Sequence, residues 1–455
     1  MKHCLSITLL AASAIALSTS CQKEKMHENP FLSEYATEYG IPPFDQIVYD
    51  DYLPALKAGI EQQNEEIAVI TDNEATPTFD NTIMALERSG AILDRVVPVF
   101  YALEESNSSD EMVEIGEQFH QLYQAHADEM MMNDKLFNRV KYLYENRDSL
   151  GLAPDQYLLV ENTYKDFTRN GALLSDSYKE KLKALNSELT DLYNQFNKNL
   201  LNATNAFSVV IDKEEDLAGL PAGTVAVAAE EASSRGMEGK WVFTLHAPSR
   251  LPVLQFAANR DLRRRIYEGY TSLASDGEYN NLPVINKILQ ARAKKAALLG
   301  FKDFGSYMTD NVMAGTTEAA ENLLMKIWTP AVAKVKEEVA EMQAIVDAEG
   351  GDFKIQPYDY YYYAEKVRQK KYDFDESQVS AYFPVDSVRK GIFGMAEKLY
   401  GVKFTEMKDA PKYYDEVNVY DVTDAATGEH VAVFMTDYFT RPSKRQGAWM
   451  SEFKG

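Results

Sequence analysis

Apolar residues recur every three to four positions along most of the chain, a spacing typical of one face of an α-helix. The pattern predicts helical structure from Ile41 to about Phe167, including one long helix over Met112–Asp148. A second long helix is predicted over Tyr178–Ala203, where leucines recur at helical spacing. That stripe indicates a buried face or a coiled-coil seam rather than a cofactor site. Helical spacing resumes at Val253.

Four shorter stretches have the clustered or alternating apolar residues that are typical of strands. The first two are Phe207–Ile211 and Trp241–Leu245. The other two, Val417–Val422 and Val431–Phe439, lie on either side of Gly428 and predict a β-hairpin. The sequence therefore predicts a mainly α fold with a small β element.

The pattern also predicts which faces of two later helices are buried. Glu318 and Glu321 mark the first turn of one helix, and Gly350 and Gly351 mark its end. Its predicted buried face consists of Leu324, Ile327, Ala331, Val335, Val339, Met342 and Val346. The charge cluster over residues 260–267 is predicted to be a solvated helix face.

Composition narrows the class of protein. The chain has 455 residues, enough for one large domain or two to three ordinary ones. With 45% hydrophobic and 26% charged residues it has the composition of a soluble globular protein. Its formal net charge of -23 argues against nucleic acid and anionic membrane surfaces as partners, because few cations are available to neutralise phosphates.

The first twenty residues predict a leader. Lys2 and His3 precede an apolar run over Leu5–Leu17, which is too short to span a bilayer. Residues 1–20 are therefore predicted to be a signal peptide of the lipoprotein type. The protein is accordingly expected to be exported to the cell envelope.

Cys21 follows three small residues, Ser18, Thr19 and Ser20, and resembles the lipidated cysteine of a bacterial lipoprotein. Residues 21–40 are then a polar tether, and contact with a membrane is expected only through the lipid anchor. The alternative is ordinary cleavage near Ala14–Ala16, which would leave Cys21 as a free thiol. In the mature protein, neither a disulfide within the chain nor a cysteine-based metal site is expected.

Candidate chemistry depends mainly on the six histidines, which are His3, His27, His120, His126, His246 and His430. None belongs to a His-Glu-x-x-His motif, in which two imidazoles on one helix face hold zinc and the Glu acts as base. His120 and His126, with Asp128 and Glu129 nearby, leave a different metal site open. A Gly-x-Ser-x-Gly elbow and a Gly-rich phosphate loop are also missing from the sequence.

Several separated motifs occur in order along the chain. They are Thr78-Phe79-x-Asn81-Thr82, Asp166-Phe167-x-Arg169-x-Gly171-Ala172-x-Leu174, Ile288-Leu289-x-x-Arg292-x-x-x-Ala296-x-Leu298-Leu299-Gly300-Phe301 and Phe434-x-x-Asp437-x-Phe439-x-Arg441-Pro442-x-Lys444-Arg445-x-Gly447-Ala448-Trp449. From Pro42 to Trp449 the chain resembles one family, the thimet-oligopeptidase-like zinc metallopeptidases, and within it the bacterial peptidyl-dipeptidase (dipeptidyl carboxypeptidase) branch.

This resemblance implies a mostly helical protein whose two halves flank a deep channel for short peptides. In the complete family enzyme, zinc is held by the His-Glu-x-x-His motif and a later Glu. Residues 41–455 are expected to be the elongated helical N-terminal part of that fold, ending before the zinc motif. No catalytic or metal-ligating residue is assigned, no zinc is expected to bind this chain, and the chain alone is expected to be inactive. Leu273 stands where an Arg is common in the peptidyl-dipeptidase branch.

The basic turn formed by Arg441, Lys444 and Arg445 is the one candidate substrate contact. Beside a peptide channel, these cations form a rim that attracts a peptide's C-terminal carboxylate. The alternative is a solvated turn that pairs with local acids.

Two interpretations of the missing zinc motif compete. Either a separately encoded C-terminal half carries the zinc, or the chain is a non-catalytic peptide-binding lipoprotein that retains the channel wall. An unrelated helical scaffold is a third alternative.

Overall fold

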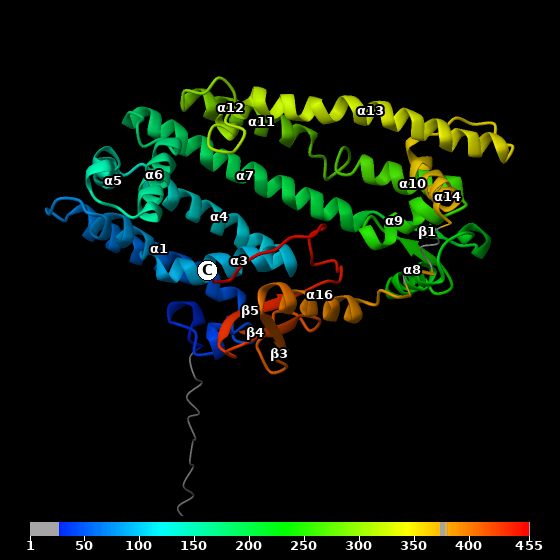
Figure 1. The fold of residues 1–455 in the computed structure, drawn as a ribbon, viewed down its shortest axis with the longest axis horizontal. Coiled ribbons are helices and arrows are strands. Elements are labelled where there is room, and N and C mark those ends of the chain that lie inside the picture. Colours follow the sequence, from blue (N-terminus) through cyan, green and yellow to red (C-terminus); the bar gives the residue numbers. More distant parts are fainter. Residues whose placement is uncertain (1–26, 374–377, 380, 455) are drawn as a thin grey trace, which may run out of the picture.

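Long helices lie side by side across most of the molecule, and two small sheets lie at its edges (Figure 1). The computed structural model describes residues 27–373, 378–379 and 381–454. The predicted fold class, mainly α with a small β element, is confirmed. The main helices are α1 (Tyr49–Thr71), α3 (Ala91–Ser106), α4 (Asp110–Met131), α5 (Asp134–Asn146), α6 (Pro154–Arg169), α7 (Asp176–Ala206), α8 (Ala222–Ser234), α9 (Ala247–Phe256), α10 (Arg260–Thr271), α11 (Leu282–Leu298), α13 (Thr317–Ala348), α14 (Tyr360–Tyr372) and α16 (Val385–Tyr400).

Shorter turns of helix connect these elements. They are α2 (Ala85–Glu87), α12 (Phe304–Thr309), the 3₁₀ turns η1 (Pro30–Leu32), η2 (Glu38–Gly40), η4 (Arg147–Ser149), η5 (Glu214–Leu217) and η6 (Pro357–Asp359), and the π-helical turn η3 (Phe79–Met84). No helix among the described residues is both long and apolar enough to cross a membrane.

Helix ends follow from local capping chemistry. The Asn133 side chain accepts a hydrogen bond from the Leu136 N–H at 3.0 Å and so begins α5. This cap divides the single helix predicted over Met112–Asp148 into α4 and α5. The helix predicted over Tyr178–Ala203 is present as α7 and is a few residues longer at both ends.

The largest core joins the N-terminal helices to the distant β element. Tyr52 of α1 packs against Phe100 of α3, and Phe100 stacks on Phe119 of α4 at 3.9 Å between ring centroids. Val417 and Val419 lie in the same core, although they are some 300 residues further along the chain. The C-terminal sheet therefore packs against α1, α3 and α4.

Residues 27–40 pack on this core, in contrast to the predicted polar tether over residues 21–40. Phe31 is fully buried, and its carbonyl oxygen accepts a hydrogen bond from Arg95 Nε at 2.8 Å. Asn29 adds to this attachment by donating a hydrogen bond from Nδ2 to the Asp51 carbonyl oxygen at 2.8 Å. Residues 1–26, which include Cys21 and the predicted signal peptide, lie outside the described residues.

All four predicted strands are present. Strands β1 (Val209–Ile211) and β2 (Trp241–Phe243) are antiparallel, and α8 fills the connection that the sequence pattern left without an element. The C-terminal sheet has the order β3-β4-β5, with β4 (Asn418–Asp424) and β5 (His430–Thr436) forming the predicted hairpin. Strand β3 (Val402–Glu406) was not predicted and pairs antiparallel with β4.

Helix α13 departs from the prediction of a continuous buried face. Met342 and Val346 are buried against α14, whereas Leu324, Ile327 and Trp328 are 67%, 60% and 63% exposed. Figure 1 shows α13 along the upper edge of the molecule. Apolar periodicity correctly predicts which residues share a face, but it does not show whether another element covers that face.

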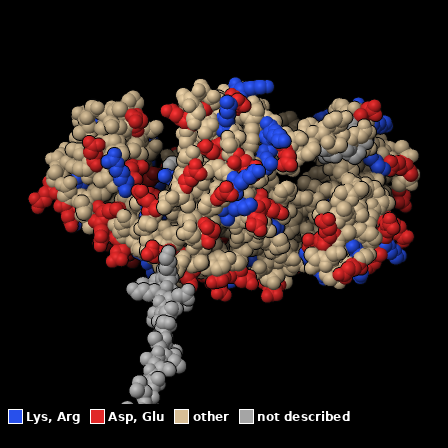
Figure 2. All heavy atoms as spheres, turned by 90° about the horizontal axis from the view of Figure 1, so that it is seen from below, with Lys and Arg blue, Asp and Glu red and all other residues tan. Residues whose placement is uncertain are grey.

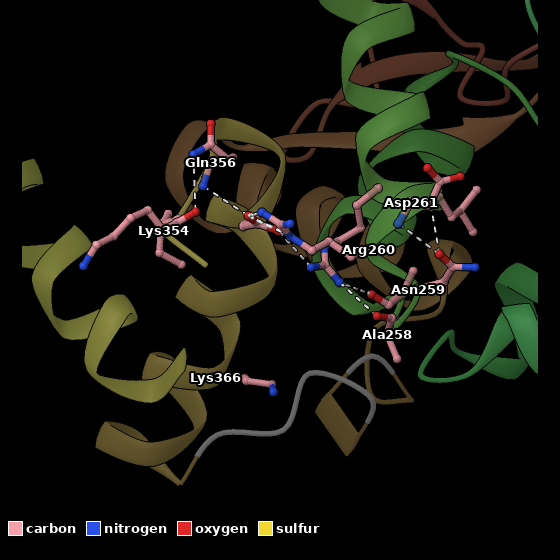
Figure 3. A network of polar contacts seen from close by, with 12 residues as sticks. Ala258, Asn259, Arg260, Asp261, Lys354, Gln356 and Lys366 are labelled. Carbon is pink, nitrogen blue, oxygen red and sulfur yellow. Dashed lines mark hydrogen bonds and ion pairs between the residues drawn. The ribbon is translucent and has the colours of Figure 1, made fainter. Parts of the chain in front are cut away.

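The Arg-rich start of α10 is also not a simple solvated face. Arg263 is buried, and its guanidinium lies 2.9 Å from an oxygen of Asp359, a side chain with no exposed surface. Arg260 contacts the second oxygen of Asp359 at 2.7 Å and is drawn in Figure 3, where it reaches toward the segment that carries Gln356. Arg264 and Arg265 are exposed, and Arg264 pairs with Asp261.

Candidate functional site

A cavity of about 500 Å³ lies between the helical body and the C-terminal loop. Its walls come from the end of α3, one face of α4, the C-terminal part of α7, the end of α10 and the loop over residues 443–446. The volume lies within the range usual for small-ligand sites. The cavity combines an apolar wall, which can bind apolar parts of a ligand, with charged side chains, which can orient it.

A hydrogen-bonded group of three side chains forms one polar wall of this cavity. His120 Nε2 lies 3.0 Å from Glu104 Oε2, and His120 Nδ1 lies 2.7 Å from Asn194 Oδ1. The His120 ring also stacks on Tyr101 with 5.3 Å between centroids. With an acceptor at each nitrogen, the arrangement favours a doubly protonated imidazolium that donates to both.

Gly116 makes room for this group. A Cβ at position 116 would lie 2.5 Å from Glu104 Oε1 and 3.5 Å from His120 Cε1. Any other residue would therefore push the Glu104 carboxylate away from α4. The glycine allows the carboxylate to lie against the helix backbone, within reach of His120.

The pKa of His120 is shifted by two opposing effects. Burial of the imidazole lowers the pKa, and the hydrogen bond and charge of Glu104, with the hydrogen bond to Asn194, raise it. The net effect raises the pKa of His120 above its ordinary value. The ring therefore carries more positive charge near neutral pH than an exposed histidine would.

Charged pairs surround the mouth of the cavity. Arg445 lies 2.5 Å from Glu105, and Lys198 lies 2.9 Å from Glu117. These side chains are between one third and about half exposed, so each pair is weak and open to exchange with a ligand.

The three cations predicted to form a substrate rim have different surroundings. Arg441 is buried and holds Asp437 with two hydrogen bonds of 2.8 Å, and it also donates to the Ser106 carbonyl oxygen. Lys444 is mostly buried and pairs with Asp437 at 3.0 Å. Lys444 and Arg445 line the cavity, whereas Arg441 fastens the loop to the end of α3. Of these three cations, only Arg445 has an exposed charge and also lines the cavity. It is therefore the only one of the three that is placed to contact a substrate as predicted.

The described residues do not fit a zinc site. His120 pairs with Glu104 and Asn194, whereas His126 lies 2.6 Å from Gln63, so the two histidines have separate partners. Burial also lowers the pKa of His126. Within the described part of the chain, no group of three or more His, Cys, Asp or Glu side chains is arranged to hold a metal ion.

Sequence reasoning missed Glu104, Gly116 and Asn194. Glu104 was one acid among seventy acidic residues, and its partner is sixteen positions away on another helix. The available signal was Gly116, a helix-breaking residue placed one turn before His120 on the same face of α4. Leu273, which the family resemblance singled out, does line the cavity.

The Glu104–His120 pair predicts a pH-dependent stability. Because the folded-state pKa of His120 is raised, the pair should stabilise the fold fully below about pH 6.5 and lose this contribution as pH rises through the folded value. Urea unfolding should therefore show that Glu104→Gln loses roughly 1 kcal/mol more at acidic than at alkaline pH. Glu114→Gln, which changes an exposed acid on α4, the helix that carries His120, is the control and should show no such difference. Parallel pH profiles for wild type and Glu104→Gln would contradict the prediction.

Known proteins align with this chain over most of its length. Residues 253–455 match the model of peptidase family M3. The chain is 37% identical over 427 residues to dipeptidyl carboxypeptidase of Escherichia coli (strain K12), covering 93% of this chain and 63% of the relative. It is 35% identical over 430 residues to dipeptidyl carboxypeptidase of Salmonella typhimurium, covering 94% and 63%. It is 30% identical over 447 residues to probable cytosolic oligopeptidase A of Arabidopsis thaliana, covering 94% and 62%.

These relatives correct the predicted localisation. Export to the cell envelope was inferred from the first twenty-one residues alone, and that prediction is wrong: the similar proteins include one named a probable cytosolic oligopeptidase A. The apolar run was interpreted as a leader because of its length and its position at the N-terminus. Neither feature carries information about the rest of the protein. Lipidation of Cys21 was part of the same inference and lies outside the described residues.

The family resemblance drawn from the motifs is confirmed. The match to the family model covers the two later motifs, and the alignments to dipeptidyl carboxypeptidases extend it through the N-terminal helices. The chain spans about 63% of the length of these two relatives. By sequence, the chain belongs with the dipeptidyl carboxypeptidases and oligopeptidases of peptidase family M3.

Proposed function

We propose that this chain is the peptide-binding, N-terminal part of a zinc metallopeptidase that cleaves short peptides as a peptidyl-dipeptidase or oligopeptidase. The observation that carries the proposal is 37% identity to a dipeptidyl carboxypeptidase over 93% of the chain. The cavity beside Glu104 and Arg445 supports it, because apolar and charged walls together suit a peptide.

The zinc residues belong, in this proposal, to a further segment of the family protein. A zinc ion held there would supply Lewis-acid chemistry for peptide hydrolysis. The described residues offer no ligand set that fits it. The chain on its own is therefore expected to bind no stoichiometric zinc and to leave peptides uncut.

An exposed apolar surface supports a partner for this chain. Leu323, Leu324, Ile327 and Trp328 of α13 are each at least 60% exposed. Helix α16 also exposes Leu399 and Tyr400. Clusters of this kind often mark surfaces that another protein segment covers. We propose that the C-terminal segment of the family, joined to this chain or encoded separately, covers at least one of these faces.

Mixing the chain with a C-terminal segment tests both parts of this proposal. The segment is the portion of Escherichia coli dipeptidyl carboxypeptidase beyond the aligned region, expressed separately. The mixture with zinc is expected to release C-terminal dipeptides from blocked tetrapeptides, and a chelator should abolish the release. Binding of a hydrophobic dye to the chain should fall at the same time. Chelator-sensitive cleavage by the chain alone, or a segment that changes neither signal, would overturn the proposal.

A second candidate function is non-catalytic peptide binding. It is favoured by the cavity, because the charged pairs and the apolar wall are complete within this chain. Tight peptide binding by the chain, unchanged by the added segment and never followed by cleavage, would support this function instead.

A further inference from the structure

One acceptor in the cavity remains unused. Glu104 Oε2 contacts His120, but Glu104 Oε1 has no hydrogen-bond partner among the residues that the structure describes. The side chain is 23% exposed, and it lines the cavity. A carboxylate oxygen in this position is available to a donor that enters from solvent.

The position of this oxygen is fixed by its neighbours. His120 holds the other oxygen, Asn194 orients His120 from the opposite side, and Gly116 leaves space for the carboxylate against α4. An acceptor that is already oriented loses little conformational entropy when a ligand binds. Glu104, on α3, therefore differs from an exposed acid such as Glu114 on the neighbouring helix α4.

The rest of the cavity fits a ligand that is both apolar and charged. Val113, Leu200, Leu201 and Leu273 supply apolar surface, with Tyr270 beside them. Arg445 and Lys198 lie among the lining residues as cations and are partly exposed. A short peptide offers matching groups, namely an ammonium group, apolar side chains and a carboxylate.

We propose that Glu104 binds the ammonium group of a short peptide in this cavity and so makes the site selective for peptides that carry one. This inference rests on the proposed function and specifies its substrate class. The overall charge of -23 acts in the same direction at longer range, since it attracts cationic ligands. Figure 2 shows acidic side chains scattered over one face of the molecule, with basic side chains gathered near its middle.

The ammonium group has two sources, the amino terminus and a lysine side chain, and four pentapeptides separate them. The set combines a free or acetylated amino terminus with lysine or norleucine at one internal position. Isothermal titration calorimetry of the full chain is expected to give roughly tenfold weaker binding when the recognised ammonium group is removed. The peptide that lacks both ammonium groups should bind most weakly.

Glu104→Gln is expected to remove this selectivity and to leave binding of the doubly neutral peptide unchanged. Glu114→Gln removes an equal charge from an exposed position on the neighbouring helix α4 and should keep the wild-type order of affinities. The comparison of peptides on wild type requires no mutation, so a folding defect in Glu104→Gln would not obscure the result. Equal affinity of wild type for all four peptides, or unchanged selectivity in Glu104→Gln, would overturn this inference alone. Failure of wild type to bind any of the four would overturn the proposed function as well.

Discussion

Replacement of Asp359 by alanine is expected to lower the free energy of unfolding by roughly 3–5 kcal/mol, because the change leaves two guanidinium groups without their shared anion. Asp359 has no exposed surface. One oxygen lies 2.7 Å from Arg260 Nη2, and the other lies 2.9 Å from Arg263 Nη2. Its carboxylate also accepts a hydrogen bond from the Gln356 N–H at 3.1 Å.

The position of these residues in the chain explains why the effect should be large. The carboxylate ties α10 to the turn that begins α14, almost 100 residues later. Arg263 stacks on Tyr362, and Arg260 lies over Phe353, so both arginines also depend on this segment for their packing. Loss of the carboxylate leaves the buried guanidinium of Arg263 without the negative charge that compensates its desolvation.

Urea unfolding of Asp359→Ala and Asp261→Ala provides the test. Asp261 is an exposed acid on the same helix whose pair with Arg264 is at the surface, so its loss should change stability by less than about 1 kcal/mol. Burial works to raise the pKa of Asp359, but hydrogen bonds from Arg260 and Arg263 outweigh it and lower the pKa. The stabilisation should therefore be complete at neutral pH and be lost only as pH falls below about 4. Equal losses in the two variants would contradict the prediction.

The sequence predicts those parts of the fold that depend on local patterns. The hairpin around Gly428 and helix α7 follow from apolar spacing and turn residues, and both are present. Arg263 and Leu324 show where this reasoning fails. Arg263 is buried because it pairs with Asp359, 96 residues further along the chain, whereas Leu324 stays mostly exposed. Both outcomes depend on tertiary contacts, which local sequence patterns do not report.

The candidate site depends even more on long-range contacts. The motif that ends at Trp449 pointed to the correct loop, because Lys444 and Arg445 do line the cavity. Glu104, His120 and Asn194 come from three helices, and no local spacing connects them. Only folding brings these residues together, so a single sequence offers at most the hint that Gly116 gives.

Replacement of Arg441 by methionine is expected to lower the free energy of unfolding by roughly 2–3 kcal/mol, because it removes charge-assisted hydrogen bonds from buried partners. Arg441 binds both oxygens of Asp437, donates to the Ser106 carbonyl oxygen and stacks on Tyr414 at 4.0 Å. Two backbone hydrogen bonds extend this attachment, from the Ser108 N–H to the Ser443 carbonyl oxygen and from the Arg445 N–H to the Glu105 carbonyl oxygen. The expected loss is below that of Asp359→Ala because Lys444 remains beside Asp437.

Arg445→Met is the matched control, since it removes the same charge from the same loop. Its partner Glu105 is one third exposed, so the variant should lose no more than about 1 kcal/mol. Titration with a peptide that has a free carboxylate separates the two roles. Arg445→Met should weaken binding while stability stays near that of wild type, whereas Arg441→Met should lower stability first and weaken binding only through the displaced loop. If Arg441→Met kept full stability and lost binding only of peptides with a free carboxylate, Arg441 would be a substrate contact, as the sequence alone first predicted.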